Sequence, residues 1–405
     1  MSVPRDAKAN EWAVVERKDP PIYETAGKDR PPLHDFTCFP TDRVTVLGPR
    51  RSPPVLAPSG NIASAISLYT AFGFLSLPLP AYTAAIQRLQ PDIAIAPADL
   101  PFLKKAPHSK KLIRMVERTE EWIDAFIGKV QSDSAGEGST SVFAPVLPVE
   151  LPIQWDYLRH LSEDILDSIS GLAIYDTNML PELTMYPSLE PLPKLSMDVA
   201  KSPRELLRQV SLGMDLCTVP FINSISDAGI ALSFSFPAPD AEDVLPLGIN
   251  MWSKDHQISL QPLVEGCTCY SCTQHHRAFL QHLLNAKEML GWNLLQAHNH
   301  HVLSRFFEGI RATLSEGSEA FENACSKFER VYESELPEGT GQRPRARGHH
   351  FKSEADQKPI NEPAWSNLSG EDSDAKKDQQ GTETPLVPNE NASALAQKGF
   401  ADRQG

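Results

Sequence analysis

Three cysteines lie close together at Cys267, Cys269 and Cys272, directly after Gly266. Thiolates and imidazoles are the ligands that zinc prefers in proteins, and a structural zinc ion takes four of them at tetrahedral corners. Small residues around the thiols leave the backbone free to fold around an ion. Six cysteines in 405 residues make no disulfide framework. The spacing therefore predicts a structural zinc site rather than buried free thiols or a disulfide.

A histidine further along the chain must supply the fourth ligand. Apolar residues recur at three- and four-residue steps over residues 274–290, which predicts an amphipathic helix that ends at Gly291. A second helix, from Trp292 to about Arg311, is expected to run back antiparallel and return its middle to the thiols. His298 lies about two turns into it and is the histidine we favour. The alternatives are His275 and His276, expected in the first turn of the first helix, and His282, His300 and His301.

The three cysteines begin a longer sequence pattern. After the C-x-C-x2-C motif come Arg277-Ala278-Phe279-Leu280 with His282-Leu283, and then Gly291 followed by Leu294-Leu295 and His298-Asn299. This pattern resembles the zinc subdomain of the tRNA-guanine transglycosylases, the queuine tRNA-ribosyltransferases. The resemblance implies one structural Zn²⁺ ion. It also implies four metal ligands, which are Cys267, Cys269, Cys272 and His298.

The residue that would carry the family's chemistry is missing. In the transglycosylases an aspartate attacks the ribose carbon while a guanine of tRNA is exchanged for a modified base, a role that suits a carboxylate. The stretch from Ser202 to Asp215 resembles the segment that leads to this aspartate, but the chain continues Leu216-Cys217-Thr218. Thr218 occupies the position of the aspartate. A hydroxyl without a neighbouring base is a poor nucleophile, so we predict no catalytic residue.

Other motifs of the family's pocket are also replaced. The resemblance therefore points to a non-catalytic branch, whose members form a heterodimer with a catalytic queuine tRNA-ribosyltransferase subunit and support exchange of the wobble guanine for queuine. The alternative is an active base-exchange enzyme that uses Asp99, Asp176 or Asp215, although Asp215 is expected to point away from the Thr218 side. A zinc hydrolase is disfavoured because four protein ligands leave no open position for water. The replaced segments are Val146-Leu147-Pro148-Val149, Tyr175-Asp176-Thr177-Asn178 and Pro97-Ala98-Asp99-Leu100.

Alternating strands and helices are expected to position these residues. Repeated strand, helix and strand units predict a parallel α/β fold. A (β/α)8 TIM-type barrel fits best, incomplete at its amino-terminal end because too little chain precedes the first strand; an open doubly wound sheet is the alternative. The segment 62–75 is helix or buried strand. The predicted strands are 43–47, 91–96, 141–146, 171–175, 194–199 and 215–220, the helices 82–89, 110–130, 155–169 and 203–211, and a hairpin pairs 231–236 with 247–251.

The composition changes along the chain and suggests four regions. Residues 1–41 are rich in proline and charge and are interpreted as irregular, and residues 42–258 form the barrel. Residues 259–336 form the zinc-binding subdomain with its helices. Residues 337–405 are polar and lack apolar periodicity, so we expect a disordered tail.

The charge and hydropathy limit the partners. A net charge of −14 argues against a surface that grips nucleic acid throughout, so tRNA contact must be local or made through the complex. Arg50-Arg51, Lys104-Lys105 and Lys110-Lys111 with Arg114 are interpreted as solvated surface.

There is no apolar run for a membrane span and no secretory leader, which predicts a cytoplasmic protein. The resemblance adds peripheral association with the mitochondrial outer membrane. It also implies a dimer interface that uses Phe279, Leu283, Trp292, Leu295, and Phe306 or Phe307.

Overall fold

The computed structural model describes residues 21–24, 30–55, 60–70, 73–100, 107–132 and 140–341. All of them belong to one compact unit, Met1–Ala355, whereas a second unit, Asp356–Gly405, lies outside the described residues. The predicted disordered tail falls almost wholly outside them. So do residues 1–20 of the segment interpreted as irregular, and most of that segment's described part is helical, in α1 (Pro21–Glu24) and α2 (Pro32–Thr37).

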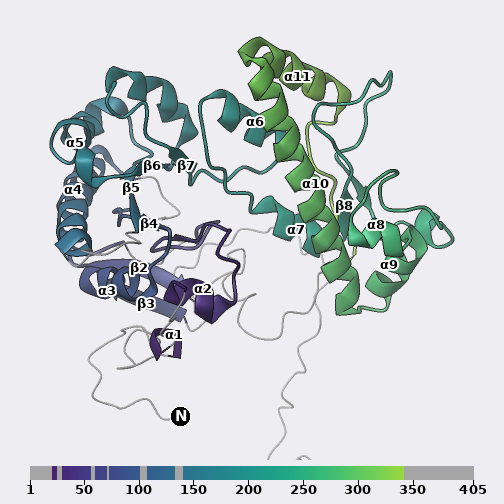
Figure 1. The fold of residues 1–405 in the computed structure, drawn as a ribbon, viewed down its shortest axis with the longest axis horizontal. Helices are drawn as coiled ribbons and strands as arrows, with labels where there is room; N and C mark the ends of the chain where they lie inside the picture. Colours follow the sequence, from purple (N-terminus) through teal and green to yellow (C-terminus); the bar gives the residue numbers. More distant parts are fainter. Residues whose placement is uncertain are drawn as a thin grey trace, which may run out of the picture. The chain divides into compact units, whose positions relative to one another are not determined.

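A parallel sheet forms the first part of the structure (Figure 1). Its strands follow the order β1-β4-β5-β6-β7, and every neighbouring pair is parallel. Leu216 continues this order through an isolated parallel bridge to Leu195. Five predicted strands are thereby confirmed, most of them shorter than expected. They are β1 (Val46–Leu47), β4 (Ile93–Ile95), β5 (Ser141–Val146), β6 (Gly171–Ile174) and β7 (Lys194–Ser196).

Helices cover one face of this sheet and leave the other face to line a pocket. Successive strand residues point to opposite faces, so Ala94 joins the large core beneath the helices, whereas Ile93 and Ile95 join a smaller cluster with Phe143 and Leu195. Both faces are apolar, as expected for a parallel sheet. The covering helices are α3 (Leu79–Leu89), α4 (Ser109–Ser132), α5 (Leu151–Glu163) with the 3-10 turn η1 (Leu166–Ser168), and η2 (Thr177–Met185).

The sheet does not close within the described part of the chain. It is a curled parallel half-barrel with five strands and the Leu216 bridge, and an eight-stranded barrel is not seen among the described residues. The predicted strand 215–220 is wrong beyond Leu216, because Pro220 already has helical backbone angles and caps α7 (Phe221–Asp227). The ambiguous segment 62–75 is resolved as strand: β2 (Ala65–Thr70) pairs antiparallel with β3 (Gly73–Pro78).

The second part of the structure packs helices against a short hairpin. The predicted hairpin is confirmed as β8 (Ile230–Leu232) paired antiparallel with β9 (Gly248–Asn250). Helix α10 contacts β8 and each of α7, α8, α9 and α11, so it is the element that holds this part together. The remaining elements are α6 (Pro203–Ser211), η3 (Lys254–His256), α8 (Tyr270–Gln274), α9 (Arg277–Asn285), α10 (Met289–Glu316) and α11 (Ser318–Val331).

The break between the two predicted helices is not where the sequence placed it. The chain turns at Lys287, whose φ is 59°, and α10 begins at Met289. Gly291 therefore lies inside the first turn of α10. A Cβ atom at this position would come within 3.1 Å of the Leu283 side chain. Gly291 is small because α9 and α10 approach each other there, and not because the helix ends.

Candidate functional site

A tight loop presents the three thiols on one side of α10. Gly266 has a φ of 73°, a left-handed angle that glycine adopts without strain and that turns the chain before Cys267. Cys269 then caps α8, since its sulfur accepts a hydrogen bond from the backbone N–H of Cys272 at 3.4 Å. The loop is anchored to α10 because the Ser271 hydroxyl donates to the Leu294 carbonyl at 2.6 Å.

The four predicted metal ligands converge. The Nδ1 atom of His298 lies 3.8 Å from the sulfur of Cys267 and 3.4 Å from the sulfurs of Cys269 and Cys272. All four ligand atoms lie within 4.8 Å of one another. Zinc–sulfur and zinc–nitrogen bonds of about 2.3 and 2.05 Å at tetrahedral angles place sulfur and nitrogen about 3.6 Å apart. The cluster is therefore large enough for one metal ion, and its donors suit zinc.

The histidine ring is oriented by the hairpin. The Nε2 atom of His298 donates to the carbonyl oxygen of Leu232 in β8 at 2.9 Å, which leaves Nδ1 unprotonated toward the sulfurs when the ring is neutral. The next residue, Asn299, accepts from the Leu232 N–H at 2.8 Å and donates to the Ile230 carbonyl and the Ser226 hydroxyl at 2.9 Å. His298 and Asn299 are both fully buried. Together they join α10 to β8 beside the metal-binding cluster.

The electrostatics of the cluster favour deprotonated sulfur. Burial raises the pKa of Cys269, but hydrogen bonds from His298 and from the Cys272 backbone outweigh it and lower the pKa to about 6. Burial lowers the pKa of His298, while its contacts with the three thiols raise it to about 11. The thiolate form of Cys269 is therefore favoured at neutral pH, where the His298 ring carries the proton, and binding of a metal ion through Nδ1 would release that proton.

The other candidate histidines lie outside the cluster. His275 and His276 connect α8 to α9, so the prediction that they occupy a first helical turn is wrong. His276 caps α9 by accepting from the Phe279 N–H at 3.1 Å, and the ring of His275 stacks on Phe279 at 4.9 Å. His300 bonds to Gln296 on the exposed side of α10. None of these three belongs to the metal-binding group of the described residues.

Thr218 lines a pocket on the inner face of the half-barrel. The pocket has a volume of about 600 Å³, and its walls come from β1, β4, β7 and the segment after Leu216. The hydroxyl oxygen of Thr218 is buried and has no hydrogen-bond partner among the described residues. Among the described residues, no aspartate or glutamate lines the pocket. Its lining consists of Val44, Val46, Leu47, Gly48, Pro49, Arg50, Arg51, Ser52, Ile93, Ile95, Leu195, Met197, Leu216, Cys217 and Thr218.

The three carboxylates considered as substitutes have structural partners. Asp99 is buried and forms an ion pair with Arg118 at 2.6 Å. Asp176 caps η2 by accepting from the N–H of Asn178 at 2.9 Å, and Asp215 accepts from the N–H of Lys194 at 2.8 Å. The expectation that Asp215 points away from the Thr218 side agrees with this bond and with the lining of the pocket. None of the three carboxylates lines the Thr218 pocket.

The pocket also contains a thiol, from Cys217, and a guanidinium, from Arg50. Burial, together with Asp215, raises the pKa of Cys217 to about 11, so its thiol stays protonated at neutral pH. Burial lowers the pKa of Arg50 to about 10. The guanidinium of Arg50 donates to the Ser67 carbonyl and to Asn61 Oδ1. The interpretation of Arg50 as solvated surface is therefore wrong.

A buried glutamine holds the segment Val146-Leu147-Pro148-Val149, one of the three in which the expected motifs are replaced. The side chain of Gln154 bonds to both the N–H and the carbonyl of Leu147, at 3.3 and 3.0 Å, and donates to the Val149 carbonyl at 2.6 Å. Gln154 is fully buried. This role was not predicted from the sequence, because Gln154 lies on α5, outside the replaced segment.

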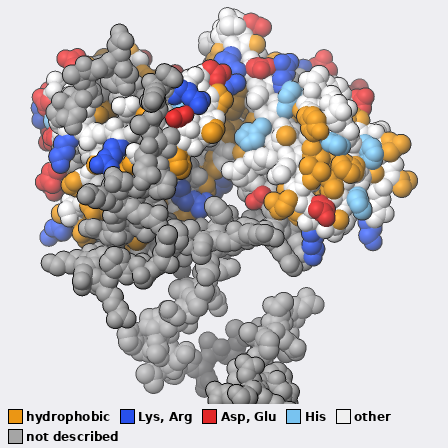
Figure 2. Space-filling view, turned by 60° about the horizontal axis from the view of Figure 1, so that its bottom comes forward, with side chains coloured by type: hydrophobic (Ala, Val, Ile, Leu, Met, Phe, Trp, Pro, Cys, Tyr) orange, Lys and Arg blue, Asp and Glu red, His pale blue; other side chains and the backbone are white. Residues whose placement is uncertain are grey.

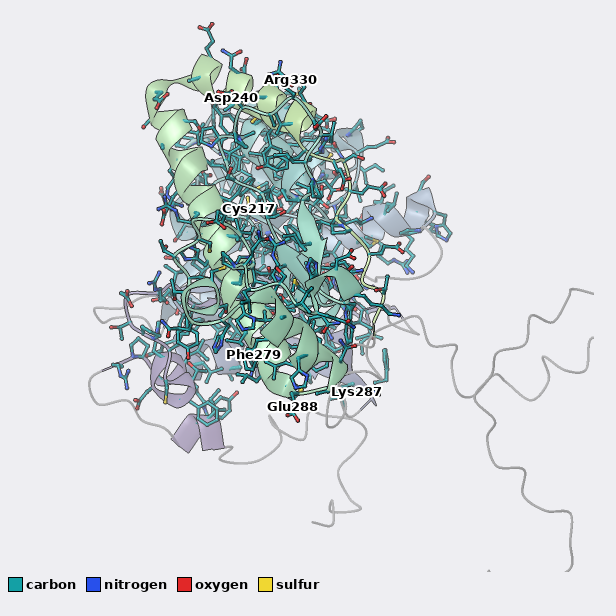
Figure 3. The ribbon with its side chains drawn as sticks, turned by 90° about the vertical axis from the view of Figure 1, so that its right-hand side faces the viewer. Cys217, Asp240, Phe279, Lys287, Glu288 and Arg330 are labelled. Carbon is teal, nitrogen blue, oxygen red and sulfur yellow. The ribbon has the colours of Figure 1, made fainter. Side chains whose placement is uncertain are left out.

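Exposed apolar side chains and histidines gather over α8, α9 and the start of α10 (Figure 2). Tyr270 on α8 is 64% exposed, and Met289 and Leu290 at the start of α10 are about half exposed. Four of the predicted interface residues are instead core residues, so that prediction needs correction for Leu283, Trp292, Leu295 and Phe306. Phe279 and Phe307 are half-buried, and Phe279 lies on α9 toward the end of the unit where α9 turns into α10 (Figure 3).

No helix in the described ranges has both the length and the apolar character needed to cross a bilayer.

Comparison with known proteins gives a consistent result. Residues 16–334 match the family described as queuine tRNA-ribosyltransferase. The chain is 34% identical to the queuine tRNA-ribosyltransferase accessory subunit 2 of Schizosaccharomyces pombe, over 82% of the chain and 74% of that protein. Proteins of the same name from Drosophila virilis and Danio rerio are 27% and 25% identical, over 70% and 78% of the chain and 70% and 82% of their own lengths.

Proposed function

Because the chain belongs to the queuine tRNA-ribosyltransferase family, we propose that it is a non-catalytic, zinc-binding subunit of a heteromeric queuine tRNA-ribosyltransferase. In this role it supports exchange of the wobble guanine of tRNA for queuine by a catalytic partner subunit. The parallel half-barrel is then part of a (β/α)8-type barrel. We place the subunit in the cytoplasm, with peripheral association at the mitochondrial outer membrane as the resemblance implies.

One observation carries the proposal. By resemblance Thr218 stands at the position of the family's nucleophile, and no carboxylate lines the pocket around it within the described ranges. Formation of a covalent bond to the ribose requires an anionic or activated nucleophile, and neither the Thr218 hydroxyl nor the protonated Cys217 thiol supplies one. The residues of this chain therefore favour support of a reaction that a partner performs.

The metal-binding cluster has a structural role in this proposal. Cys267, Cys269, Cys272 and His298 would hold Zn²⁺ as four protein ligands, which leaves no coordination position for substrate or water. When bound, the ion supplies folding free energy and no reaction chemistry. It joins the thiol loop to α10, on which the exposed Met289 and Leu290 lie.

The partner surface lies in the same region. Apolar side chains of this size are seldom exposed together unless another protein covers them. We define the docking patch as Ile258, Leu260, Tyr270, Met289 and Leu290, which are 89%, 76%, 64%, 51% and 48% exposed. The patch replaces the buried Leu283, Trp292, Leu295 and Phe306 as the expected contact with the catalytic subunit.

Co-expression with a catalytic queuine tRNA-ribosyltransferase tests the proposal. We expect the two chains to co-purify, and labelled guanine in tRNA to be exchanged by the pair and not by this chain alone. Replacing Leu260, Tyr270 and Leu290 together with serine should abolish co-purification while the metal content stays at one ion per chain. Exchange of guanine by the purified chain without a partner would refute the proposal.

The second candidate function is an active enzyme that uses another carboxylate. The ion pair of Asp99 and the capping bond of Asp176 argue against it. Asp99→Asn and Asp176→Asn variants in the reconstituted pair distinguish the two functions. Unchanged exchange rates at saturating tRNA support the non-catalytic role, whereas a loss of several orders of magnitude at saturating tRNA, with normal folding, would support the enzyme.

A further inference from the structure

A second cavity lies beside the amino-terminal end of α4, apart from the Thr218 pocket. Its volume is about 430 Å³, and none of the described residues lines both this cavity and the Thr218 pocket. Five residues with basic side chains take part in its wall, four of them on α4. They are His108, Lys110, Lys111, Arg114 and Arg118.

The basic residues repeat along one face of the helix. Lys110, Arg114 and Arg118 are spaced by four residues, so they lie above one another with about 6 Å of rise between neighbours. Lys111 is three residues before Arg114 and lines the same cavity. Like charges at this spacing repel each other. An anion bound among them would relieve this repulsion.

The floor of the cavity is fixed by a buried network. Arg118 donates to Asp99 Oδ2 at 2.6 Å, and Asn61 donates to Asp99 Oδ1 at 2.7 Å. Asn61 in turn accepts from the Ser67 N–H at 2.9 Å, which ties the floor to strand β2. The carboxylate of Asp99 is thus neutralised by Arg118. It is the only carboxylate among the described residues that line this cavity.

The remaining cations have no partner of opposite charge within the described ranges. Lys110, Lys111 and Arg114 form none of the ion pairs found among the described residues, and Lys110 and Arg114 are exposed. The chain as a whole has a net charge of −14. A hollow with three uncompensated cations is therefore a local exception on an acidic protein, and it attracts anions to one place.

We propose that this cavity binds backbone phosphates of the tRNA on which the heteromer acts, with Lys110, Lys111 and Arg114 as the phosphate contacts. The inference rests on the proposed function, since an acidic subunit of a tRNA-modifying complex can contact RNA only through a local basic site. Cations one helical turn apart on a fixed floor can reach successive phosphates of one strand. The site provides no sequence readout, because it offers phosphate contacts alone.

Binding of tRNA by the reconstituted heteromer tests this site. A Lys110→Ala/Lys111→Ala/Arg114→Ala variant should bind tRNA about tenfold or more weakly at low salt. In a plot of the logarithm of the tRNA association constant against the logarithm of the salt concentration, the slope should become shallower by about 1 for each phosphate contact removed. A matched control, Lys201→Ala/Lys254→Ala/Arg311→Ala, removes the same charge from exposed positions outside the cavity and should change the affinity and the slope little.

The outcomes separate this inference from the proposed function. If the α4 variant pairs with the catalytic subunit but keeps the wild-type affinity and salt slope, the phosphate site is refuted and the accessory role stands. If both triple variants weaken binding equally, only net charge matters and the site is likewise refuted. Poly-glutamate is added as a competitor at the same concentration of negative charge as tRNA. If it competes as effectively as tRNA, the cavity binds an acidic protein segment and not RNA. If the wild-type chain does not pair with a catalytic subunit, the proposed function fails.

Discussion

The imidazole of His298 donates from Nε2 to the carbonyl oxygen of Leu232 at 2.9 Å, while its Nδ1 atom faces the three cysteine sulfurs. Leu232 is the last residue of β8, so the hairpin sets the tautomer and the direction of a metal-ligating ring on α10. The thiol loop, the hairpin and α10 are thereby coupled. A change in any one of them is expected to affect metal binding.

Asn299 tests this coupling one residue beyond the ligand. An Asn299→Leu variant loses the hydrogen bonds to the Leu232 N–H, the Ile230 carbonyl and the Ser226 hydroxyl, and leaves buried polar groups unpaired. We expect a loss of about 3 kcal/mol in the free energy of unfolding, measured by urea denaturation. Asn293→Leu on the exposed side of α10 is the matched control and should cost little. Equal stability of the two variants would contradict the coupling.

Removal of a thiol should unfold the subdomain. Structural zinc contributes on the order of 10 kcal/mol to small metal-binding units, so Cys269→Ser should lose the metal and make residues 259–336 sensitive to protease. Mass spectrometry measures the metal content, and limited proteolysis measures the protease sensitivity. Cys38→Ser, which changes an exposed thiol outside the cluster, should retain one ion per chain. Full metal content in the Cys269→Ser protein would show that the ligand assignment is wrong.

A glycine pair tests the packing of α10. A Cβ atom at Gly309 would lie 1.8 Å from the carbonyl oxygen of Phe236, so α10 can approach the segment after β8 only where this helix has no side chain. Gly309→Ala should lower the melting temperature by several degrees. In contrast, Gly128→Ala on α4 meets nothing within 4 Å and should stabilise the protein by up to about 1 kcal/mol through higher helix propensity. Stabilisation by both substitutions would show that the close approach does not exist.

A histidine clamp between α4 and α5 should make stability depend on pH. His160 bonds to Asp124 and Asp164 at 2.9 Å each. Burial lowers the pKa of His160, but the hydrogen bonds to the two carboxylates outweigh it, so the net shift is upward from 6.5. A raised folded-state pKa means that the ionic contribution is complete below pH 6.5 and disappears as the pH rises through the folded-state pKa.

Replacing the clamp should therefore matter only at low pH. His160→Gln should lower the free energy of unfolding by about 1 kcal/mol near pH 6, a modest loss because both carboxylates are partly solvated. The loss should fall toward zero at pH 9. Urea denaturation of wild type and variant across this pH range measures the difference. His282→Gln, at an exposed position on α9, controls for loss of one surface histidine. A cost that is the same at pH 6 and pH 9 would exclude an ionic clamp.

The sequence predicted best where local signals decide the structure. Helix α6 has the predicted bounds, because Ser202 caps it by accepting from the Glu205 N–H and Pro203 fits the first turn. The convergence of Cys267, Cys269, Cys272 and His298 also followed from spacing, since a helical hairpin returns its second helix to the loop. Here local geometry and residue type were sufficient.

Features that depend on contacts distant in the sequence could not be predicted in the same way. Gly291 has the residue type of a helix end, but its small size serves the packing of α10 on Leu283. The expected interface residues Leu283, Trp292, Leu295 and Phe306 repeat at helical spacing whether they face a partner or a core, and only the fold shows that they are buried. The cavity at α4 depends on Asn61, which is far from Lys110 in the sequence.

We propose that this chain has no nucleophile of its own and supports a partner subunit that has one. The most direct measurement is to incubate the reconstituted heteromer with tRNA, stop the reaction by denaturation, and identify the chain that carries covalently bound tRNA by mass spectrometry. We predict an adduct on the catalytic subunit and none on this chain, including the peptide that contains Thr218. A tRNA adduct on this chain would contradict the account.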